Sequence, residues 1–365
     1  MWGDIAIAFL LAFITTFVLT PYTIKIAKRI GAMDVPKDER RMHKKPMPKF
    51  GGPALIVGFL VSTIYLIITT SIEGSLNIFG PEDYYIKLLG FFGGVIVLST
   101  FCFFDDIKGI HPLVKLLGQT IAATIVVACG IRIDGINLPF LSGNVDLNNA
   151  ISIVITMIWV IGITNAINLI DGLDGLSTGI SIISCISLLI IFALNGSPLI
   201  AIIMITALVG CLTGFLPFNF NPAKTFIGDI GSNFVGFALS VVSILGIAKT
   251  ATAFVIVLPI IVLGLPIFDT LSAIVRRLIK GRSIKAVFQA DKGHLHHKLI
   301  EKGLTQKEAV LILYGISVAC GMFAVILFES DIWKAISFAL LVIAAVAIGY
   351  KEFFKLKNED NKENN

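Results

Sequence analysis

The chain has few charged residues for its length. Asp, Glu, Lys and Arg make up 15% of its 365 residues, whereas hydrophobic residues make up 56%. This balance excludes an ordinary soluble globular protein and is typical of a protein that crosses a membrane several times. The five cysteines lie inside apolar stretches without paired close spacing, which disfavours a disulfide framework and a zinc site. The absence of an internal repeat disfavours a transporter built from two related halves.

Long apolar runs account for most of the sequence. A helix that crosses the hydrocarbon core needs roughly 20 mainly apolar residues. We predict eleven such helices, at residues 4–27, 50–70, 86–104, 113–130, 150–168, 176–194, 199–217, 232–248, 252–275, 308–328 and 332–350. The first run lacks a basic start and a small-residue cleavage site, so we expect a retained helix. The sequence therefore predicts an all-α polytopic membrane protein, with a membrane domain over 1–350 and a polar cytoplasmic tail over 351–365.

Basic residues are distributed unevenly between alternate loops. Of the 29 Lys and Arg residues, only Lys87, Arg132, Lys249 and Lys334 fall in the loops of one side. Because cytoplasmic loops accumulate Lys and Arg, we expect an extracytoplasmic N-terminus and a cytoplasmic C-terminus. Four polar clusters at segment ends then lie on the cytoplasmic side, which predicts a site in the cytoplasmic loops.

The most informative cluster is the loop between the fifth and sixth apolar runs. Asn165, Asn168, Asp171 and Asp174 recur there at three-residue spacing, among several glycines. Helix capping or a glycine turn explains one aspartate. It does not explain two asparagines on one face of a helix end, with two aspartates continuing the spacing. A column of oxygen ligands of this kind suits magnesium or the polar edge of a nucleotide.

Two adjacent acids end the third apolar run. Asp105 and Asp106 lie where the partial negative charge of a helix C-terminus disfavours them. One interpretation is a hydrated helix end whose charge is balanced by Lys108 and Lys115. The other is a site for a cation or a phosphate, with Lys115 as its positive partner.

A loop rich in proline, glycine and asparagine precedes the eighth run. Within it, Asp229 either caps a helix that begins near Ser232, or allows a metal and backbone N–H groups to approach a pyrophosphate. Phe226 either packs against neighbouring residues or offers a flat face to a base.

Two further cytoplasmic loops are strongly basic. The loop over 276–307 contains three of the five histidines within four positions, His294, His296 and His297, together with Arg282. Topology alone explains the positive charge. The histidines favour contacts with phosphate oxygens over metal ligation, because no cysteine or carboxylate stands beside them at zinc-like spacing. In the first loop, His43 and Lys44 belong either to a plain basic anchor or to one wall of a phosphate site.

In this order and on this side, the clusters resemble the polyprenyl-phosphate N-acetylhexosamine-1-phosphate transferase family, over nearly the whole chain. The matching features are His43 with Pro46, Pro48 and Gly51-Gly52, Asp105-Asp106, Lys115-Leu-Leu-Gly-Gln119, Asn165 through Gly175, Phe226 through Ser232, and His294-Leu-His-His297. Leu295 interrupts the histidines, whereas the branch that uses UDP-MurNAc-pentapeptide typically has three in a row. The chain therefore looks more like the branch that uses UDP-GlcNAc, with other UDP-N-acetylhexosamines as alternatives.

The resemblance implies a membrane enzyme that transfers GlcNAc-1-phosphate from UDP-GlcNAc to undecaprenyl phosphate. The products would be undecaprenyl-diphosphate-GlcNAc and UMP, in the first membrane step of cell-envelope glycopolymer synthesis. It implies a magnesium cofactor, which manganese could replace, and a homodimer among the lipids of the bacterial cytoplasmic membrane. No nucleic acid is expected among its partners.

The resemblance also assigns roles to individual residues. It implies catalytic roles for Asp105, Asp106, Lys115, Asp171 and Asp229, with Asp229, Asn168 and Asp171 as magnesium ligands. It implies substrate binding by His43, Lys44, Asn165, Asn168, Gly172, Leu173, Asp174, Phe226, Arg282, His294, His296 and His297. The uracil is expected near Gly172, Leu173 and Asp174, with Phe226 stacking on the ring. Asp105 could act as a base or as an organiser of the lipid phosphate.

Two other functions are compatible with an apolar chain of this kind. A transporter or flippase for an anionic substrate predicts acids near the middle of helices. Here only Asp269, deep in the ninth apolar run, has that location. An inactive scaffold of the same fold predicts the loss of at least one cluster, and all clusters are present.

Overall fold

We analysed a computed structural model, which describes residues 2–36, 45–75, 83–137, 144–247, 257–281, 293–330 and 332–343. Its helices are α1 (Trp2–Ile30), α2 (Gly52–Ile72), α3 (Tyr84–Lys108), α4 (Pro112–Ala128), α5 (Asn149–Ile170), α6 (Leu176–Asn195), α7 (Leu199–Asn219), α8 (Gly228–Ile247), α9 (Val257–Val262), α10 (Gly264–Gly281), α11 (Leu295–Glu301) and α12 (Gln306–Glu329). Two short antiparallel hairpins pair β1 (Met33–Asp34) with β2 (Met47–Pro48), and β3 (Gly135–Asn137) with β4 (Asn144–Asp146). The predictions for His43, Lys44, Arg282 and the tail over 351–365 lie outside the described residues.

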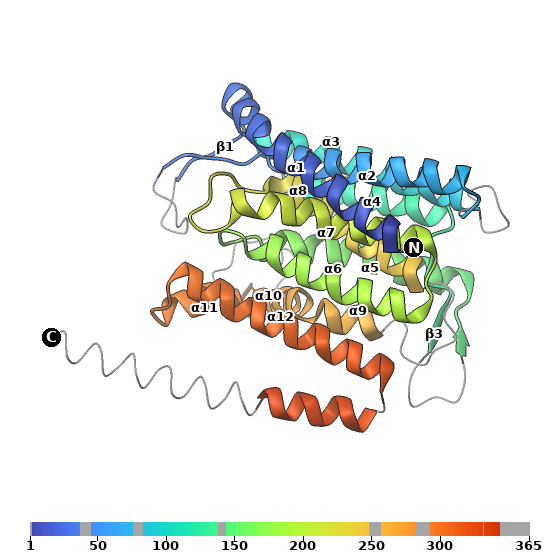
Figure 1. Cartoon of the computed structure of the whole chain (residues 1–365). Coiled ribbons are helices and arrows are strands. Elements are labelled where there is room, and N and C mark those ends of the chain that lie inside the picture. The colour runs from blue at the N-terminus through green and yellow to red at the C-terminus, as the bar shows by residue number, and fades with distance from the viewer. Residues whose placement is uncertain are drawn as a thin grey trace.

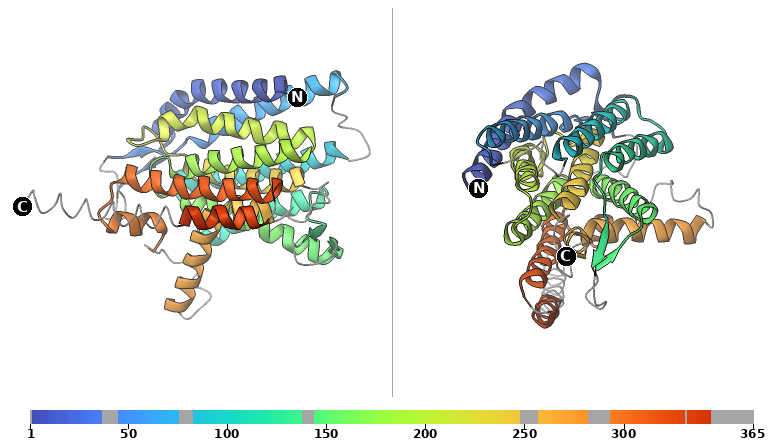
Figure 2. Two further views of the ribbon diagram at one scale, coloured as in Figure 1. Left: turned by 60° about the horizontal axis from the view of Figure 1, so that its bottom comes forward. Right: turned by 90° about the vertical axis from the view of Figure 1, so that its right-hand side faces the viewer.

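Most of the helices run roughly side by side and form one bundle (Figures 1 and 2). Within the described ranges, eight helices are long and apolar enough to cross a membrane: α1, α2, α3, α5, α6, α7, α8 and α12. α4 and a helix over Ile332–Ile343 are shorter and also apolar. The prediction of an all-α polytopic membrane protein is thus confirmed, whereas the total of eleven spans and their orientation stay predictions.

The ninth predicted span, 252–275, is not one continuous helix in its described part. α9 ends at Val262 and α10 begins at Gly264. Pro266 explains the break, because a proline lacks the N–H that would bond to Val262 and its ring clashes with the carbonyl four residues earlier. α10 turns away from the bundle, as Figure 2 shows. Pro266 is visible in the sequence, but the continuous run of apolar residues around it led to the prediction of a single helix.

α7 and α8 lie at the centre of the bundle and bury most of their residues. Close approach to α8 depends on small residues. A Cβ on Gly236 would lie 2.7 Å from Thr164 Cα of α5, and one on Gly52 of α2 would lie 2.4 Å from the nitrogen of Gly231. Without hydrophobic driving force in lipid, such close backbone packing is a main source of helix association. It brings α2, α5 and α8 together at the end of the bundle where the polar clusters lie.

Candidate active site

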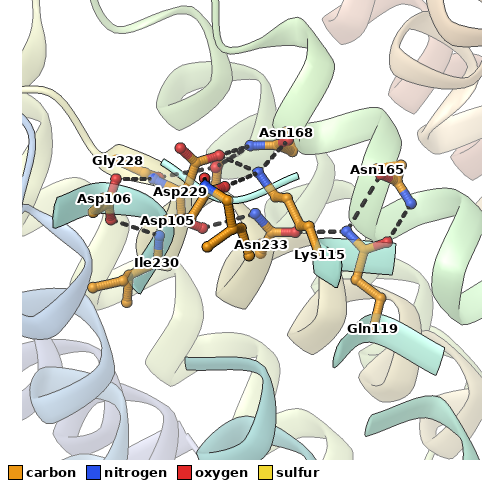
Figure 3. A network of polar contacts seen from close by, with 12 residues as sticks. Asp105, Asp106, Lys115, Gln119, Asn165, Asn168, Gly228, Asp229, Ile230 and Asn233 are labelled. Carbon is orange, nitrogen blue, oxygen red and sulfur yellow. Dashed lines mark hydrogen bonds and ion pairs between the residues drawn. The ribbon is translucent and has the colours of Figure 1, made fainter. Parts of the chain in front are cut away.

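Four helices place polar side chains around one ammonium group. Lys115 of α4 extends its Nζ to within 3.2 Å of Asp105 Oδ2 on α3, and donates to Asn168 Oδ1 on α5 at 3.1 Å. The same Nζ forms an ion pair with Asp229 Oδ1 on α8. Figure 3 shows the four side chains converging. These residues lie as far as 124 positions apart along the chain, so the structure joins three of the clusters that the sequence singled out.

Asn168 links the two charged partners of this group. Its Nδ2 donates to Asp229 Oδ1 at 3.0 Å and to Ser232 Oγ at 2.8 Å, while its Oδ1 accepts from Lys115. α8 begins at Gly228 and not near Ser232, so Asp229 lies in the first helical turn. Its carboxylate faces Lys115 and Asn168, and so the capping alternative for Asp229 is wrong.

Asp106 supplies the cap instead, from another helix. Its Oδ1 accepts from the N–H of Asp229 at 2.9 Å, and its Oδ2 accepts from the N–H of Ile230 at 3.0 Å. Lys49 Nζ lies 3.6 Å from the same carboxylate. A carboxylate at a helix N-terminus satisfies N–H groups that have no partner within the helix, and typically contributes about 1 kcal/mol.

The two adjacent acids therefore have different surroundings. Asp105 faces Lys115, whereas the carboxylate of Asp106 is taken up by the α8 backbone and holds Asp229 in place. The carboxylate of Asp106 thus holds the start of α8, and the catalytic role that the resemblance implies for it stays a prediction. Gly228 permits the arrangement, because it has a φ of +74° and a Cβ there would lie 2.6 Å from Lys49 O. Gly228 was predicted only as part of the motif over Phe226 through Ser232, without a role of its own, and Lys49 was not predicted as a site residue.

The predicted column of four polar residues does not continue along one helix beyond Asn168, and the role of Asp171 as a magnesium ligand stays a prediction. α5 ends at Ile170, so the three-residue spacing no longer describes one helix face. Asp171 Oδ1 accepts from Ser177 Oγ at 2.5 Å. Asp174 Oδ2 accepts from Asn221 Nδ2 at 2.9 Å and from the N–H of Ala223 at 3.1 Å. Burial raises the pKa of Asp171 to about 7.

At the other end of the column, Asn165 turns toward α4. Its Nδ2 donates to Gln119 Oε1 at 2.6 Å. Leu173, another predicted substrate contact, is a buried member of an apolar cluster with Leu176 and Leu313. Phe226 is half-buried, and its main chain pairs with the segment that follows β2, since its carbonyl accepts from the N–H of Gly51 at 3.1 Å. Its predicted stacking on uracil stays a prediction.

The histidine cluster meets the loop after α5. His296 packs so closely on Gly172 that a Cβ there would lie 2.3 Å from His296 Nε2. His294 Nδ1 lies 2.8 Å from Asp269 Oδ2, and the N–H of Leu295 donates to Asp269 Oδ1 at 2.9 Å. Asp269, whose role the sequence left open, therefore anchors the start of α11. The structure brings together Gly172, His294 and His296, with His297 beside them.

His296 predicts a distinct acid sensitivity of the fold. The residue is 2% exposed, and burial lowers its pKa to about 3. An unfolded chain binds the proton already below pH 6.5, so stability is lost as the pH falls from 6.5 toward 3. Between pH 7.5 and pH 5 this group accounts for about 2 kcal/mol. Thermal melts in detergent at both pH values should therefore show a smaller loss for His296→Gln than for the wild type.

Exposed His111, at the start of α4, offers the matched control. The variant His111→Gln should keep the wild-type difference between the two melts. Equal pH dependence in His296→Gln and the wild type would show that His296 is protonated in the folded state.

We call Asp105, Lys115, Asn168 and Asp229 the charged group. Its composition is relevant to the expected magnesium ion. Carboxylate and carboxamide oxygens are the ligands that magnesium prefers, and oxygens of Asp105, Asn168 and Asp229 already converge on a positive charge. The residues thus fit the ion chemically. Within the described ranges, no three His, Cys, Asp or Glu side chains form a metal-binding group. Phosphate oxygens or waters would have to complete the coordination.

Comparisons with known proteins agree with this geometry. A family model described as glycosyl transferase family 4 matches residues 88–247. The chain is 35% identical to a probable undecaprenyl-phosphate N-acetylglucosaminyl 1-phosphate transferase of Bacillus subtilis, over 94% of this chain and 90% of the relative. It is 32% identical to a decaprenyl-phosphate N-acetylglucosaminephosphotransferase of Mycobacterium tuberculosis, over 94% and 88%. A phospho-N-acetylmuramoyl-pentapeptide-transferase of Staphylococcus saprophyticus is 28% identical, over 86% and 96%. The chain therefore belongs to glycosyl transferase family 4.

Proposed function

We propose that this protein transfers GlcNAc-1-phosphate from UDP-GlcNAc to undecaprenyl phosphate and releases UMP. The observation that carries the proposal is the ammonium of Lys115 between Asp105, Asn168 and Asp229, at one end of an apolar bundle. Such a site suits two anionic reactants, one of which is dissolved in the membrane. The choice of sugar follows the relatives, because the proteins named for N-acetylglucosamine share more identity with this chain than the pentapeptide transferase does.

The reaction is a displacement at phosphorus. A terminal oxygen of the lipid phosphate attacks the sugar-bearing phosphorus of UDP-GlcNAc and forms the new P–O bond. The P–O bond to UMP breaks, and UMP leaves with its bonding electrons. Positioning and electrostatic stabilisation supply most of the catalysis in such transfers. Lys115 would attract and orient the phosphates, and Asp105 would fix the direction of that ammonium.

Asp229 and Asn168 would hold magnesium together with the donor pyrophosphate. When bound there, the ion would offset the repulsion between the phosphates and stabilise the leaving UMP. Gly172 lies against His296 of α11. The loop over 172–174 and the neighbouring histidines would contact uridine, sugar and phosphate. We expect this end of the bundle to face the cytoplasm of a bacterial cell, and the enzyme to act as a homodimer.

Purified, detergent-solubilised protein tests the proposal directly. It is incubated with undecaprenyl phosphate, magnesium and one of several donors: UDP-GlcNAc, UDP-GalNAc or UDP-MurNAc-pentapeptide. UMP and the lipid product are measured together, and Asp229→Asn, purified in parallel, reports background turnover. We expect equal amounts of both products with UDP-GlcNAc, and no UMP when the lipid is omitted.

Each other result has a defined meaning. Turnover with UDP-GalNAc alone, or with the pentapeptide donor alone, would leave the family assignment intact and overturn the choice of sugar. The absence of turnover with every donor, in a preparation that melts cooperatively, would overturn the proposed function.

A further inference from the structure

A second polar layer lies one helical turn deeper than the charged group. Gln119 follows Lys115 by four residues on α4, Asn165 precedes Asn168 by three on α5, and Asn233 follows Asp229 by four on α8. α4 and α8 begin near the charged group, whereas α5 ends near it. All three carboxamides therefore lie on the same side of the charged group, one turn further from the helix ends. We call Gln119, Asn165 and Asn233 the carboxamide layer (Figure 3).

The three carboxamides bond to one another across the helices. Asn165 Nδ2 donates to Gln119 Oε1 at 2.6 Å, and Gln119 Nε2 donates back to Asn165 Oδ1 at 3.3 Å. Gln119 Nε2 also donates to Asn233 Oδ1 at 2.8 Å. Asn233 Nδ2 then donates to the main-chain carbonyl of Asp229 at 2.8 Å. The layer therefore connects α4, α5 and α8, and ends on the backbone of a residue in the charged group.

A role in stability alone does not explain this layer. Gln119 is 2% exposed inside the apolar helix α4, and Asn233 is fully buried inside α8, which is long and apolar enough to cross a membrane. Polar groups at such a depth are costly unless they are satisfied, and apolar side chains of similar size often stabilise a bundle equally well. Directional hydrogen bonds differ from apolar packing because they fix how each helix is rotated about its axis. Rotation matters here, since Lys115, Asn168 and Asp229 must meet.

We infer that Gln119, Asn165 and Asn233 are positioning residues that set the relative rotation of α4, α5 and α8, and thereby the geometry of Lys115, Asn168 and Asp229. The kinetic consequence of this inference depends on the proposed function. A misplacement of about 1 Å can lower the rate on the order of 10²-fold. Loss of the layer should therefore lower kcat while leaving the KM for UDP-GlcNAc nearly unchanged.

The variant Gln119→Met removes every hydrogen bond of the central carboxamide and keeps its approximate volume. Its matched control is Ser243→Ala, which deletes a hydrogen bond from Trp159 between α5 and α8 far from the charged group. We expect Gln119→Met to lower kcat on the order of 10²-fold, with KM within twofold of the wild type. The control should keep wild-type kcat. If both variants lose stability but keep kcat, the layer is only structural and the inference is wrong.

A double variant that swaps the two side chains distinguishes an effect on site geometry from a general loss of stability. The double variant Gln119→Asn with Asn165→Gln shortens one carboxamide and lengthens its partner, so that a reciprocal pair can still form between α4 and α5. It should recover most of the kcat that Gln119→Asn alone loses. Equal kcat in the single and double variants would contradict positioning through this pair.

Hydrogen–deuterium exchange provides a readout that needs no turnover. Amides of the first turn of α8, in peptides that span 226–236, should exchange faster in Gln119→Met than in the wild type, and at the wild-type rate in Ser243→Ala. Unchanged exchange in Gln119→Met would overturn the inference. If the wild-type protein is inactive with every donor, the proposed function fails, and the exchange data still decide whether the layer positions α8.

Discussion

Replacement of Lys115 by methionine is expected to lower kcat on the order of 10³-fold. Its ammonium contacts Asp105, Asn168 and Asp229, so its loss leaves two carboxylates facing each other without a positive charge between them. The same charge is the one that would attract both phosphates of the reaction. UMP release under saturating donor and acceptor measures the effect. A thermal melt of the same sample shows how much of the protein remains folded.

Lys108→Met provides the control for Lys115→Met. Lys108 is exposed at the end of α3, near the same end of the bundle, so its replacement removes an equal charge without touching the charged group. We expect kcat within twofold of the wild type. Residual activity above a tenth in Lys115→Met would contradict the role of this ammonium. An equal loss in both variants would show that net charge, and not this contact, matters.

Replacement of Asp105 by asparagine is expected to reduce kcat by a similar factor, on the order of 10³-fold. Both oxygens of Asp105 have partners. Oδ2 lies 3.2 Å from Lys115 Nζ, and Oδ1 accepts from the N–H of Ile110 at 2.9 Å. A carboxylate held in this way organises the ammonium. The lipid phosphate needs no base near neutral pH, because the second pKa of a phosphate monoester is about 6.

The pH–rate profile distinguishes an organiser from a base. An organising Asp105 predicts a wild-type kcat that is nearly flat from pH 6.5 to 9, and a uniformly lower profile for Asp105→Asn. Asp134, an exposed acid at the other end of the bundle, provides the control variant Asp134→Asn, with wild-type kcat at every pH. A steep acid limb in the wild type that disappears in Asp105→Asn would establish general base catalysis instead.

The convergence of Lys115, Asn168 and Asp229 could be predicted because all three lie at the ends of apolar segments, on the same side of the predicted membrane. The different partners of the adjacent residues Asp105 and Asp106 could not be predicted. Neighbouring residues of an α-helix point about 100° apart, and which of them meets Lys115 depends on how α3 is rotated against α4 and α8. The partners of Asp106 come from the start of α8, 123 and 124 positions away.

Helix ends set a second limit on prediction. The spacing of Asn165, Asn168, Asp171 and Asp174 describes one face only while the helix continues, and α5 ends at Ile170. The contact of Gly172 with His296 has no counterpart in local sequence, because a glycine that permits a close approach does not reveal what approaches. Capping and turn residues near Gly172 were visible, but their partners on α11 and α12 were not.

The capping of α8 by Asp106 also has a consequence for the order of events during synthesis. A chain grows from its N-terminus, and its segments enter the membrane in that order. Asp105, Asp106 and Lys115 are therefore in place before the ribosome has made Asp229, and the backbone N–H groups that Asp106 binds do not yet exist. Until then, we expect Asp105, Asp106 and Lys115 to remain hydrated at the membrane surface. Insertion of α8 is thus the step at which Lys115 gains Asp229 as a partner, and Asp106 gains the N–H groups that it binds.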